Sequence, residues 1–345
     1  MKPRTLLALV LSAIALPLLA ATPVPDAPHS VLDAMGPQAA HIVSLWRVFV
    51  VTCALVFGAI LAVLLLVLWR TPRGDERTAP DLVGARGPER KPRRTVAAAV
   101  AGSTVLLVLL VVVSVFTDRA LAALSLRDAV NLEVTAHQFW WTVRYVSGPV
   151  SDTFETANEI HVPVGRPVVV KLNSDDVIHS LWLPNLAGKR DLIPGRTALI
   201  QFRADKPGVY RGQCAEFCGF QHALMGLLVV ADPPDRYQAW LQAQRQPAAE
   251  PTEAQALRGK ELFQSKSCAM CHAVQGTLAQ GGHAPDLTHL GSRQTLAAGT
   301  LANTPQQLAA WIADPQKFKP GTNMPATPLS PQDLQAVVAY LGTLR

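Results

Sequence analysis

Two long apolar runs dominate the hydrophobic pattern in the first third of the chain. Residues 48–69 and 95–116 contain no charged residue. Each run reaches the length of about 20 residues that a helix needs to cross a bilayer. A helix satisfies its own backbone hydrogen bonds in lipid, so both runs are predicted as membrane spans. Two buried core helices would instead require a very large soluble domain around them, which the neighbouring segments do not provide.

A shorter apolar run lies at the N-terminus. Two basic residues precede it, Pro17 interrupts it, and small residues follow at Ala20 and Ala21. This arrangement predicts a secretory signal peptide over residues 1–21. An uncleaved first membrane helix is the alternative, and the shortness of the apolar stretch disfavours it.

The loop between the two runs is strongly basic. Residues 70–94 hold eight Lys and Arg against four Asp and Glu, which gives +4 of the formal net charge of +6. Positive loops stay in the cytoplasm, so the N-terminus and everything after Asp118 are predicted on the opposite side. In a bacterial inner membrane this side is the periplasm or cell exterior. The basic balance therefore reports membrane topology, and no nucleic-acid partner is expected.

The pattern changes to short alternating and β-branched runs between residues 132 and 232. About seven strands in about 100 residues predict an all-β Greek-key sandwich. Gly and Pro turns separate the runs, which cover residues 132–135, 141–146, 159–164, 168–172, 198–202, 208–211 and 227–230. A polar linker with a short helical start is predicted over residues 238–252.

The period becomes helical from Glu253 onward. A first helix is expected to end at Ser265, a second to begin after Thr304 and a third after Ser330. Helices this short need a cofactor to supply their core. The predicted organisation is a membrane hairpin over 22–120, a β domain over 121–236, a linker over 237–252 and an all-α domain over 253–345.

One short segment gathers four possible metal ligands. Cys214, Cys218, His222 and Met225 lie within twelve residues, and His179 is the candidate for a second imidazole. Thiolate and imidazole suit copper or zinc. A single blue copper uses only one cysteine, so the additional thiolate predicts two copper ions bridged by two sulfurs. Zinc and a disulfide are the alternatives, and zinc rarely uses methionine.

Three motifs carry a resemblance to a known family. D-V-I-H-S at 176–180, K-R-D-L-I-P-G-R at 189–196 and C-x-E-x-C-G-x-x-H-x-x-M at 214–225 stand in this order. Residues 40–232 thereby resemble subunit II of haem–copper cytochrome c oxidases, with a membrane hairpin and a cupredoxin domain. The resemblance implies a dinuclear CuA centre. It implies ligation by the backbone carbonyl of Glu216 and by the side chains of His179, Cys214, Cys218, His222 and Met225.

The resemblance carries two further expectations. The Glu216 carboxylate would face oxidase subunit I and help to hold a magnesium ion there. The family usually has a tryptophan directly after a His-Gln pair, where electrons enter from soluble cytochrome c. This chain has Phe139 at that position, followed by Trp140 and Trp141. These three residues are candidates for the point where electrons enter, and a plain core aromatic is the alternative for Phe139. We hypothesise that a tethered donor has relaxed the need for the tryptophan.

A second cysteine cluster predicts a covalent haem. Cys268, Cys271 and His272 form the C-x-x-C-H attachment signature. The two thiols would form thioethers to the haem, and His272 would be the proximal iron ligand. A zinc-binding or redox-active cysteine pair is the alternative.

The sixth iron ligand is predicted by elimination among the methionines. Met324 remains once those of the signal segment, the copper cluster, the attachment loop and the chain before the first span are set aside. His283 and His289 are the alternatives, and His289 falls in a segment that resembles the one packed beside haem in class I cytochromes c. Residues 253–345 as a whole resemble such a domain.

These features predict the subunit of a respiratory terminal oxidase where electrons enter. Electrons would pass from a donor, such as cytochrome c or a bc1-type complex, through haem c and CuA to the oxygen-reducing site of subunit I. Subunit III is a further expected partner. A nitric oxide reductase with a CuA subunit is the alternative. The haem signature disfavours a copper sensor, and the copper cysteines exclude a quinol oxidase subunit.

Overall fold

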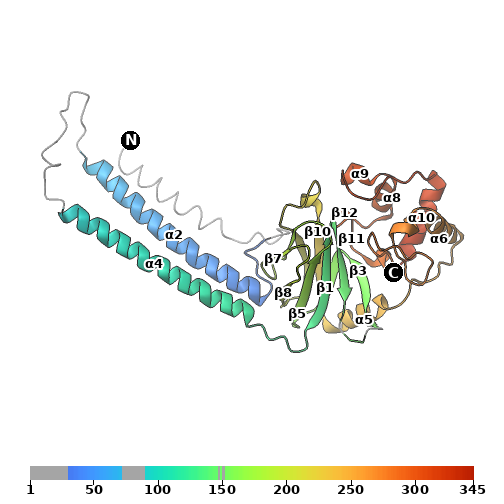
Figure 1. Ribbon diagram of the computed structural model, residues 1–345, viewed down its shortest axis with the longest axis horizontal. Helices are drawn as coiled ribbons and strands as arrows, with labels where there is room; N and C mark the ends of the chain where they lie inside the picture. Colours follow the sequence, from blue (N-terminus) through green and yellow to red (C-terminus); the bar gives the residue numbers. More distant parts are fainter. Residues whose placement is uncertain (1–29, 72–89, 147, 150–151) are drawn as a thin grey trace, which may run out of the picture. The chain divides into compact units, whose positions relative to one another are not determined.

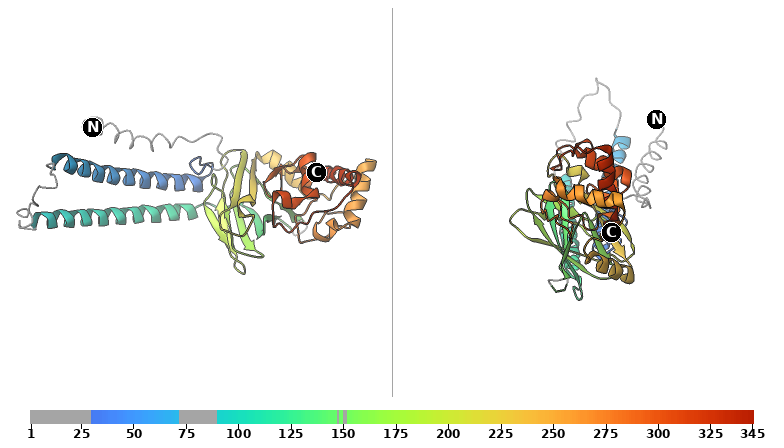
Figure 2. Two further views of the ribbon diagram at one scale, coloured as in Figure 1. Left: turned by 90° about the horizontal axis from the view of Figure 1, so that it is seen from above. Right: turned by 90° about the vertical axis from the view of Figure 1, so that its right-hand side faces the viewer.

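Two long apolar helices form the membrane hairpin. The computed structural model describes residues 30–71, 90–146, 148–149 and 152–345. Helices α2 (Pro37–Arg70) and α4 (Arg90–Ala122) run antiparallel (Figures 1 and 2) and extend beyond the predicted spans at both ends. Both contain an apolar window long enough to cross a membrane, and none of that window is buried. The predicted signal peptide and most of the basic loop lie outside the described residues.

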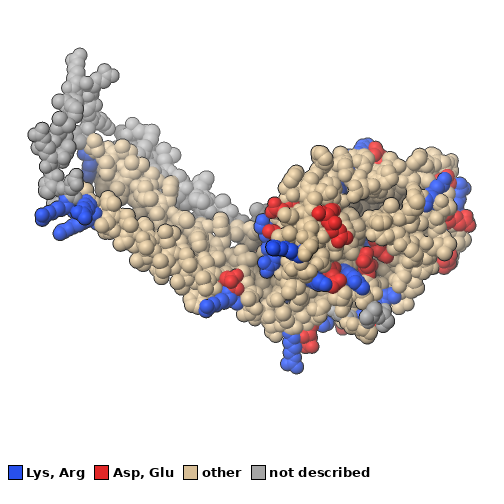
Figure 3. All heavy atoms as spheres, viewed as in Figure 1, with Lys and Arg blue, Asp and Glu red and all other residues tan. Residues whose placement is uncertain are grey.

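Charged residues on the hairpin are confined to its ends on the face seen in Figure 3. Exposed arginines, including Arg93 and Arg94, lie in the first turns of α4, and Leu107 and Val111 are more than 60% exposed farther along it. Apolar side chains exposed over this length are unfavourable in water and favourable in hydrocarbon. The helix surface therefore fits a lipid environment.

The β domain is a sandwich of two five-stranded sheets. The first sheet has the order β3 (Phe154–Ala157), β2 (Trp140–Tyr145), β1 (Val130–His137), β5 (Val168–Ser174) and β8 (Ala198–Phe202). The second has the order β4 (Glu159–Pro163), β10 (Gly226–Asp232), β9 (Gly208–Cys214), β6 (His179–Trp182) and β7 (Lys189–Leu192). Strands β1 and β5 pair in parallel, as do β4 and β10, so the chain crosses between the sheets as a Greek key does.

Alternation along the strands builds the core between the two sheets. Strand β1 buries Val130, Leu132, Val134 and Ala136, every second residue, as a half-buried strand does. Strands β3, β6 and β7 are additional to those that the sequence pattern predicts. They are only four residues long, and β7 exposes three polar residues before one buried leucine, so no periodic signal marks them.

The predicted linker contains a longer helix than its sequence indicates. Helix α5 (Pro234–Gln244) begins at a proline in its first turn, before the predicted polar segment. Its Trp240 stacks on the His161 ring at a centroid distance of 4.2 Å and packs against Tyr145. This aromatic contact anchors α5 to the sandwich.

The C-terminal domain is helical. It consists of α6 (Ala254–Ser265), α7 (Cys268–Cys271), α8 (Pro305–Ala313), α9 (Pro315–Phe318) and α10 (Pro331–Thr343), with a two-stranded ribbon of β11 (Thr295–Leu296) and β12 (Leu301–Ala302). The predicted starts of α8 and α10 carry side-chain caps: the hydroxyls of Thr304 and Ser330 accept hydrogen bonds from amides three residues on. The single-turn helices α7 and α9 are additional to the three predicted helices.

Helices α6 and α10 pack in close contact at Gly259. A Cβ atom at this position would lie 1.9 Å from the Ala336 carbonyl oxygen and 2.8 Å from the Tyr340 Cβ. We therefore expect Gly259→Ala to destabilise the haem domain by about 2 kcal/mol, the usual cost of overpacking. Thermal unfolding of the purified protein, followed through haem absorbance, measures this change.

A second glycine in the same helix pair provides the control. No atom lies within 4 Å of a Cβ built at Gly342 in α10. Alanine there improves helix propensity, so Gly342→Ala is expected to leave stability unchanged or slightly raised. Equal losses in the two variants would show that the Gly259 contact does not determine the packing.

Candidate metal centres

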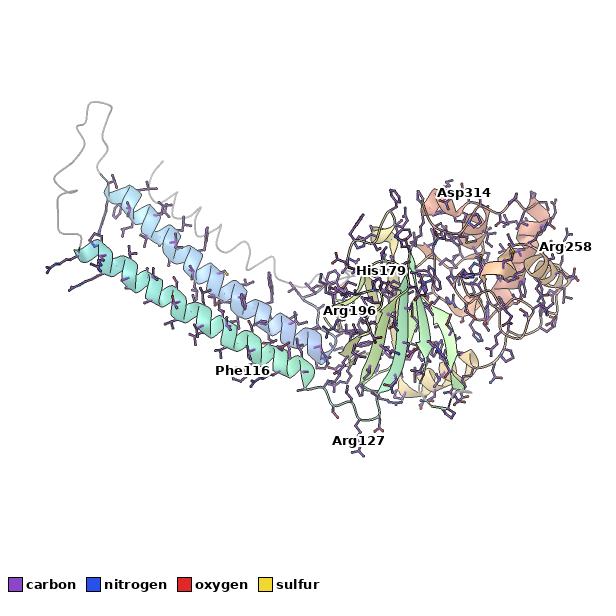
Figure 4. All side chains as sticks on the ribbon, viewed as in Figure 1. Phe116, Arg127, His179, Arg196, Arg258 and Asp314 are labelled. Atoms are coloured by element: carbon purple, nitrogen blue, oxygen red, sulfur yellow. The ribbon has the colours of Figure 1, made fainter. Side chains whose placement is uncertain are left out.

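The strand order brings the copper-type ligands to one end of the sandwich. Cys214 is the last residue of β9, His222 opens the short helix η2 (His222–Leu224), and Met225 immediately precedes β10. His179 is the first residue of β6, which pairs with β9 through Leu181 opposite Cys214. Figure 4 labels His179 within the sandwich. Antiparallel pairing of β6 with β9 thus brings His179 next to Cys214, although the two residues are 35 positions apart in sequence.

The five donor side chains converge on one small volume. The two cysteine sulfurs lie 3.9 Å apart. Cys214 Sγ lies 3.8 Å from His179 Nδ1, and Cys218 Sγ lies 3.7 Å from His222 Nδ1. Met225 Sδ lies 3.9 Å from Cys218 Sγ. Two thiols, each beside one imidazole, with a thioether at one end, form a donor set that suits soft or borderline metals such as copper.

The charge state of the cysteine pair also fits a metal. Contact with the Cys218 thiol and with His179 lowers the pKa of Cys214, and the resulting thiolate raises the pKa of Cys218. Two thiolates this close repel each other. Both are ionised together only when bound cations neutralise them, as metal ions do to coordinating thiols. The pair therefore needs metal to reach its doubly ionised form.

Asp176 holds the His179 ring. Its Oδ1 lies 2.7 Å from His179 Nε2, and its Oδ2 accepts a hydrogen bond from the Gln138 amide at 2.6 Å. Burial raises the pKa of Asp176, but the hydrogen bonds from His179 and from backbone amides outweigh it and hold the pKa below its usual value. A carboxylate on Nε2 leaves Nδ1 available to a metal. The sequence motif contains Asp176 but assigns no role to it.

The cysteine loop is exposed at Glu216 and closely packed at Gly219, directly after Cys218. The Glu216 carbonyl oxygen lies 3.2 Å from Cys214 Sγ, while the Glu216 residue is exposed. Gly219 has a φ of +125°, and a Cβ there would lie 3.0 Å from Gln138 Nε2 and 3.2 Å from the Phe139 ring. The same Gln138 side chain donates a hydrogen bond to the Cys218 carbonyl. Segment 138–139 therefore lies directly against the cysteine loop.

The three aromatic candidates differ in exposure. Phe139 is 5% exposed and Trp141 is fully buried, with its ring centroid 6.2 Å from that of His179. Trp140 is half-buried and stacks on His137 at 4.3 Å. Only Trp140 among the three is reachable from solvent to a substantial degree, while Trp141 contacts the ligand set from the core side.

The haem signature forms helix α7, with its histidine oriented by a backbone carbonyl. His272 Nδ1 lies 2.7 Å from the Pro285 carbonyl oxygen, which can only accept a hydrogen bond. The Nδ1–H therefore donates, and Nε2 keeps the lone pair that iron requires. Burial lowers the pKa of His272, which favours the neutral ligating form. These residues fit a c-type haem.

The segment that carries Met324 is held by Gln316. The Gln316 amide donates to the carbonyl oxygens of Thr322 at 2.8 Å and Met324 at 3.0 Å, and its own oxygen accepts from the Gly321 amide at 2.8 Å. No motif points to Gln316, because a glutamine in a short helix has no distinctive pattern. Three hydrogen bonds of the Gln316 side chain thus fix the backbone of residues 321–324, which includes Met324.

The two alternative histidines differ from Met324 in their surroundings. His289 is buried, with Nε2 lying 3.1 Å from the Gln246 carbonyl oxygen. His283 is exposed beside the attachment helix. The hydrogen bond of His289 to the segment after α5 suits a residue that holds the domain together.

Comparison with known proteins relates the chain to two families. The family model described as cytochrome c oxidase subunit II, periplasmic domain, matches residues 145–232, and that for cytochrome c matches residues 256–345. The chain is 35% identical over 325 residues to cytochrome c oxidase subunit 2 of Alkalihalophilus pseudofirmus, covering 91% of this chain and 90% of that protein. It is 33% identical to the corresponding subunit of Bacillus sp., covering 70% and 71%.

A solved structure is also similar to part of the chain. The periplasmic domain of subunit II of cytochrome oxidase from Bradyrhizobium japonicum is 30% identical, with a TM-score of 0.32, and the match covers 34% of this chain and 93% of that one. The family matches and the observed elements confirm the predicted fold class, which combines an apolar helix pair, a cupredoxin-type sandwich and a helical cytochrome c domain.

Proposed function

Because this chain belongs to the cytochrome c oxidase subunit 2 family, we propose that it takes up electrons at its haem domain and passes them through a copper centre to subunit I. It is subunit II of a haem–copper oxidase, with a cytochrome c domain at its C-terminal end. The observation that supports the electron path is that one chain carries a cluster of copper-type donors in the sandwich and an oriented haem-type histidine in the neighbouring helical domain. No residue of this chain is proposed to act on oxygen itself.

The proposed ligands of the two centres are the residues that the sequence motifs single out, and the distances within the cysteine cluster support those of the copper centre. The proposed CuA ligands are the side chains of His179, Cys214, Cys218, His222 and Met225 with the carbonyl oxygen of Glu216. Cys268 and Cys271 hold the haem covalently, and His272 and Met324 bind its iron. When bound, each centre accepts and releases one electron. The exposed Glu216 carboxylate is proposed to share a magnesium ion with subunit I.

The membrane topology follows from the charge of the loop. The proposed orientation puts residues 70–94 in the cytoplasm and both redox domains on the periplasmic or exterior side. The proposed domains are the hairpin over 22–120, the cupredoxin domain over 121–236 and the cytochrome c domain over 253–345. Subunit I binds the hairpin within the oxidase, subunit III is a further partner, and the donor is a cytochrome c or a bc1-type complex.

Stopped-flow reduction tests the order of transfer. The purified protein with both centres loaded is mixed with reduced cytochrome c, and haem and copper absorbance are followed separately. The proposed path requires the haem to be reduced first, with copper following at the rate at which the haem is reoxidised. Reduction of copper before haem would contradict this order. The nitric oxide reductase alternative is not favoured, because the relatives are oxidase subunits.

A further inference from the structure

A lysine in the methionine-bearing segment is buried where a charge is costly. Lys319 is 2% exposed, and its ammonium donates to the carbonyl oxygens of Phe139 at 2.9 Å and Ala297 at 3.2 Å. Within the described part of the chain, no carboxylate pairs with it. Burial lowers the pKa of Lys319 to about 8. A buried ammonium costs free energy unless it is hydrogen-bonded, so its two carbonyl partners are the contacts that retain it.

The two carbonyls belong to different domains. Ala297 lies in the cytochrome c domain, just after β11, whereas Phe139 lies between β1 and β2 of the sandwich. Lys319 itself stands five positions before Met324. Its side chain therefore bridges the segment that carries the proposed iron ligand and the aromatic segment beside the copper loop.

Neighbouring contacts extend this bridge to the cysteine loop. The Asn323 amide reaches the Gln138 carbonyl oxygen at 3.5 Å, and the Gln138 side chain donates to the Cys218 carbonyl. Gln221, between Cys218 and His222, donates to the Pro320 carbonyl at 2.6 Å. Residues 319–323 thus contact both segment 138–139, which lies against Cys218, and Gln221, which follows it in the chain. A main-chain carbonyl is the acceptor in each of these contacts.

A second group of contacts joins the same two domains elsewhere. Glu159, which is 3% exposed, accepts hydrogen bonds from the amides of Gln294 at 2.7 Å and Thr295 at 3.0 Å. Arg293 donates to the Thr156 hydroxyl at 3.2 Å. The contacts of Lys319 and those of Glu159 and Arg293 are two separate anchors between the domains. Together they restrict rotation of one domain on the other, so the two domains pack in one preferred orientation. Lys319 belongs to the anchor that adjoins the copper ligands.

We propose that Lys319 is a positioning residue, which clamps the Met324 segment onto the backbone of Phe139 and so fixes the contact across which an electron passes from haem to copper. This inference rests on the proposed function. In the step itself the haem iron is oxidised by one electron and the copper centre is reduced by one, and no bond is made or broken. The clamp also covers Phe139, which leaves a soluble donor to react at the haem domain.

Amine labelling of the intact protein tests the clamp without using electron transfer. Lys317 is exposed in the same segment, two positions away. With an acylating reagent and mass spectrometry, we expect Lys317 to be modified at least about tenfold faster than Lys319, because a closed interface excludes the reagent. If Lys319 were accessible, its lowered pKa would make its amine react at least as fast as that of Lys317. Equal labelling of the two lysines would therefore overturn the proposal.

Substitution tests the consequence for transfer. Lys319→Met keeps the length and apolar stem but removes the donor, and we expect the haem-to-copper rate to fall about tenfold, the factor that the loss of a charge-assisted hydrogen bond allows. Lys319→Gln restores a neutral donor and is expected to recover most of the rate. Lys317→Met is the matched control and should transfer at the unaltered rate. A wild-type rate in Lys319→Met would overturn the proposal.

Two spectra separate positioning from damage. The visible spectrum of the ferric haem and the electron paramagnetic resonance of the copper are expected to be the same in Lys319→Met and in the unaltered protein. A changed haem spectrum would show that the lysine shapes the ligand segment itself, against the proposal. If the unaltered protein shows no haem-to-copper transfer at all, the proposed function is wrong. If transfer slows only in Lys319→Met, the proposed function stands and the clamp is supported.

Discussion

Replacement of Cys218 by serine is expected to abolish binding of the dinuclear copper while leaving the haem attached. The Cys218 sulfur lies within 3.9 Å of donor atoms from Cys214, His222 and Met225, and so stands at the middle of the cluster. A serine hydroxyl is a hard ligand that stays protonated, so it cannot bridge two copper ions as a thiolate does. Copper content should fall from two per haem to one or none, and electron transfer to subunit I by at least about a hundredfold.

Elemental analysis and electron paramagnetic resonance of the purified protein measure this outcome. Cys53 provides a matched control, because it lies exposed on the apolar helix α2 and is not one of the proposed ligands. Cys53→Ser should retain two copper ions per haem and the unaltered resonance. Retention of both copper ions in Cys218→Ser would mean that the second thiolate is not a bridge. Zinc at the site of the unaltered protein would contradict the copper assignment itself.

Replacement of Met324 by leucine is expected to lower the reduction potential of the haem. A thioether stabilises ferrous over ferric iron, and methionine with histidine is the ligand pair of high-potential cytochromes c. Leucine keeps the size but has no donor atom. A hundredfold loss in the preference for ferrous iron corresponds to about 120 mV, since a tenfold change is about 59 mV for one electron. A redox titration of the haem, with the ferric charge-transfer band of methionine ligation, checks this.

The methionine of the attachment loop is the control for Met324. Met270 lies between the two haem cysteines and is 68% exposed. Met270→Leu is expected to leave both the potential and the band unchanged. If Met324→Leu also leaves them unchanged, a histidine occupies the sixth position, and His283→Ala and His289→Ala then identify which one. The buried hydrogen bond of His289 predicts that its loss affects stability more than potential.

Features that depend on consecutive residues are predictable from the amino-acid sequence by itself. The two cysteine motifs place their ligands within one turn or loop, so spacing alone brings the donors together, as Cys214 and Cys218 show. Apolar length predicts the spans because lipid admits only helices with satisfied backbones. The caps at Thr304 and Ser330 are likewise local, since each side chain bonds an amide three residues on.

The tertiary structure decided the remaining features, because they depend on segments that are distant in sequence. Asp176 orients the His179 ring only because Gln138 and His179 meet around it, and the short strands β6 and β7 form only by pairing. The role of Lys319 depends on a carbonyl 180 positions away. Every residue has a main-chain carbonyl, so the sequence does not indicate which of them will accept a particular hydrogen bond. The candidate metal donors could therefore be proposed from residue type and spacing, whereas the contact between the two domains that carry them was visible only in the folded chain.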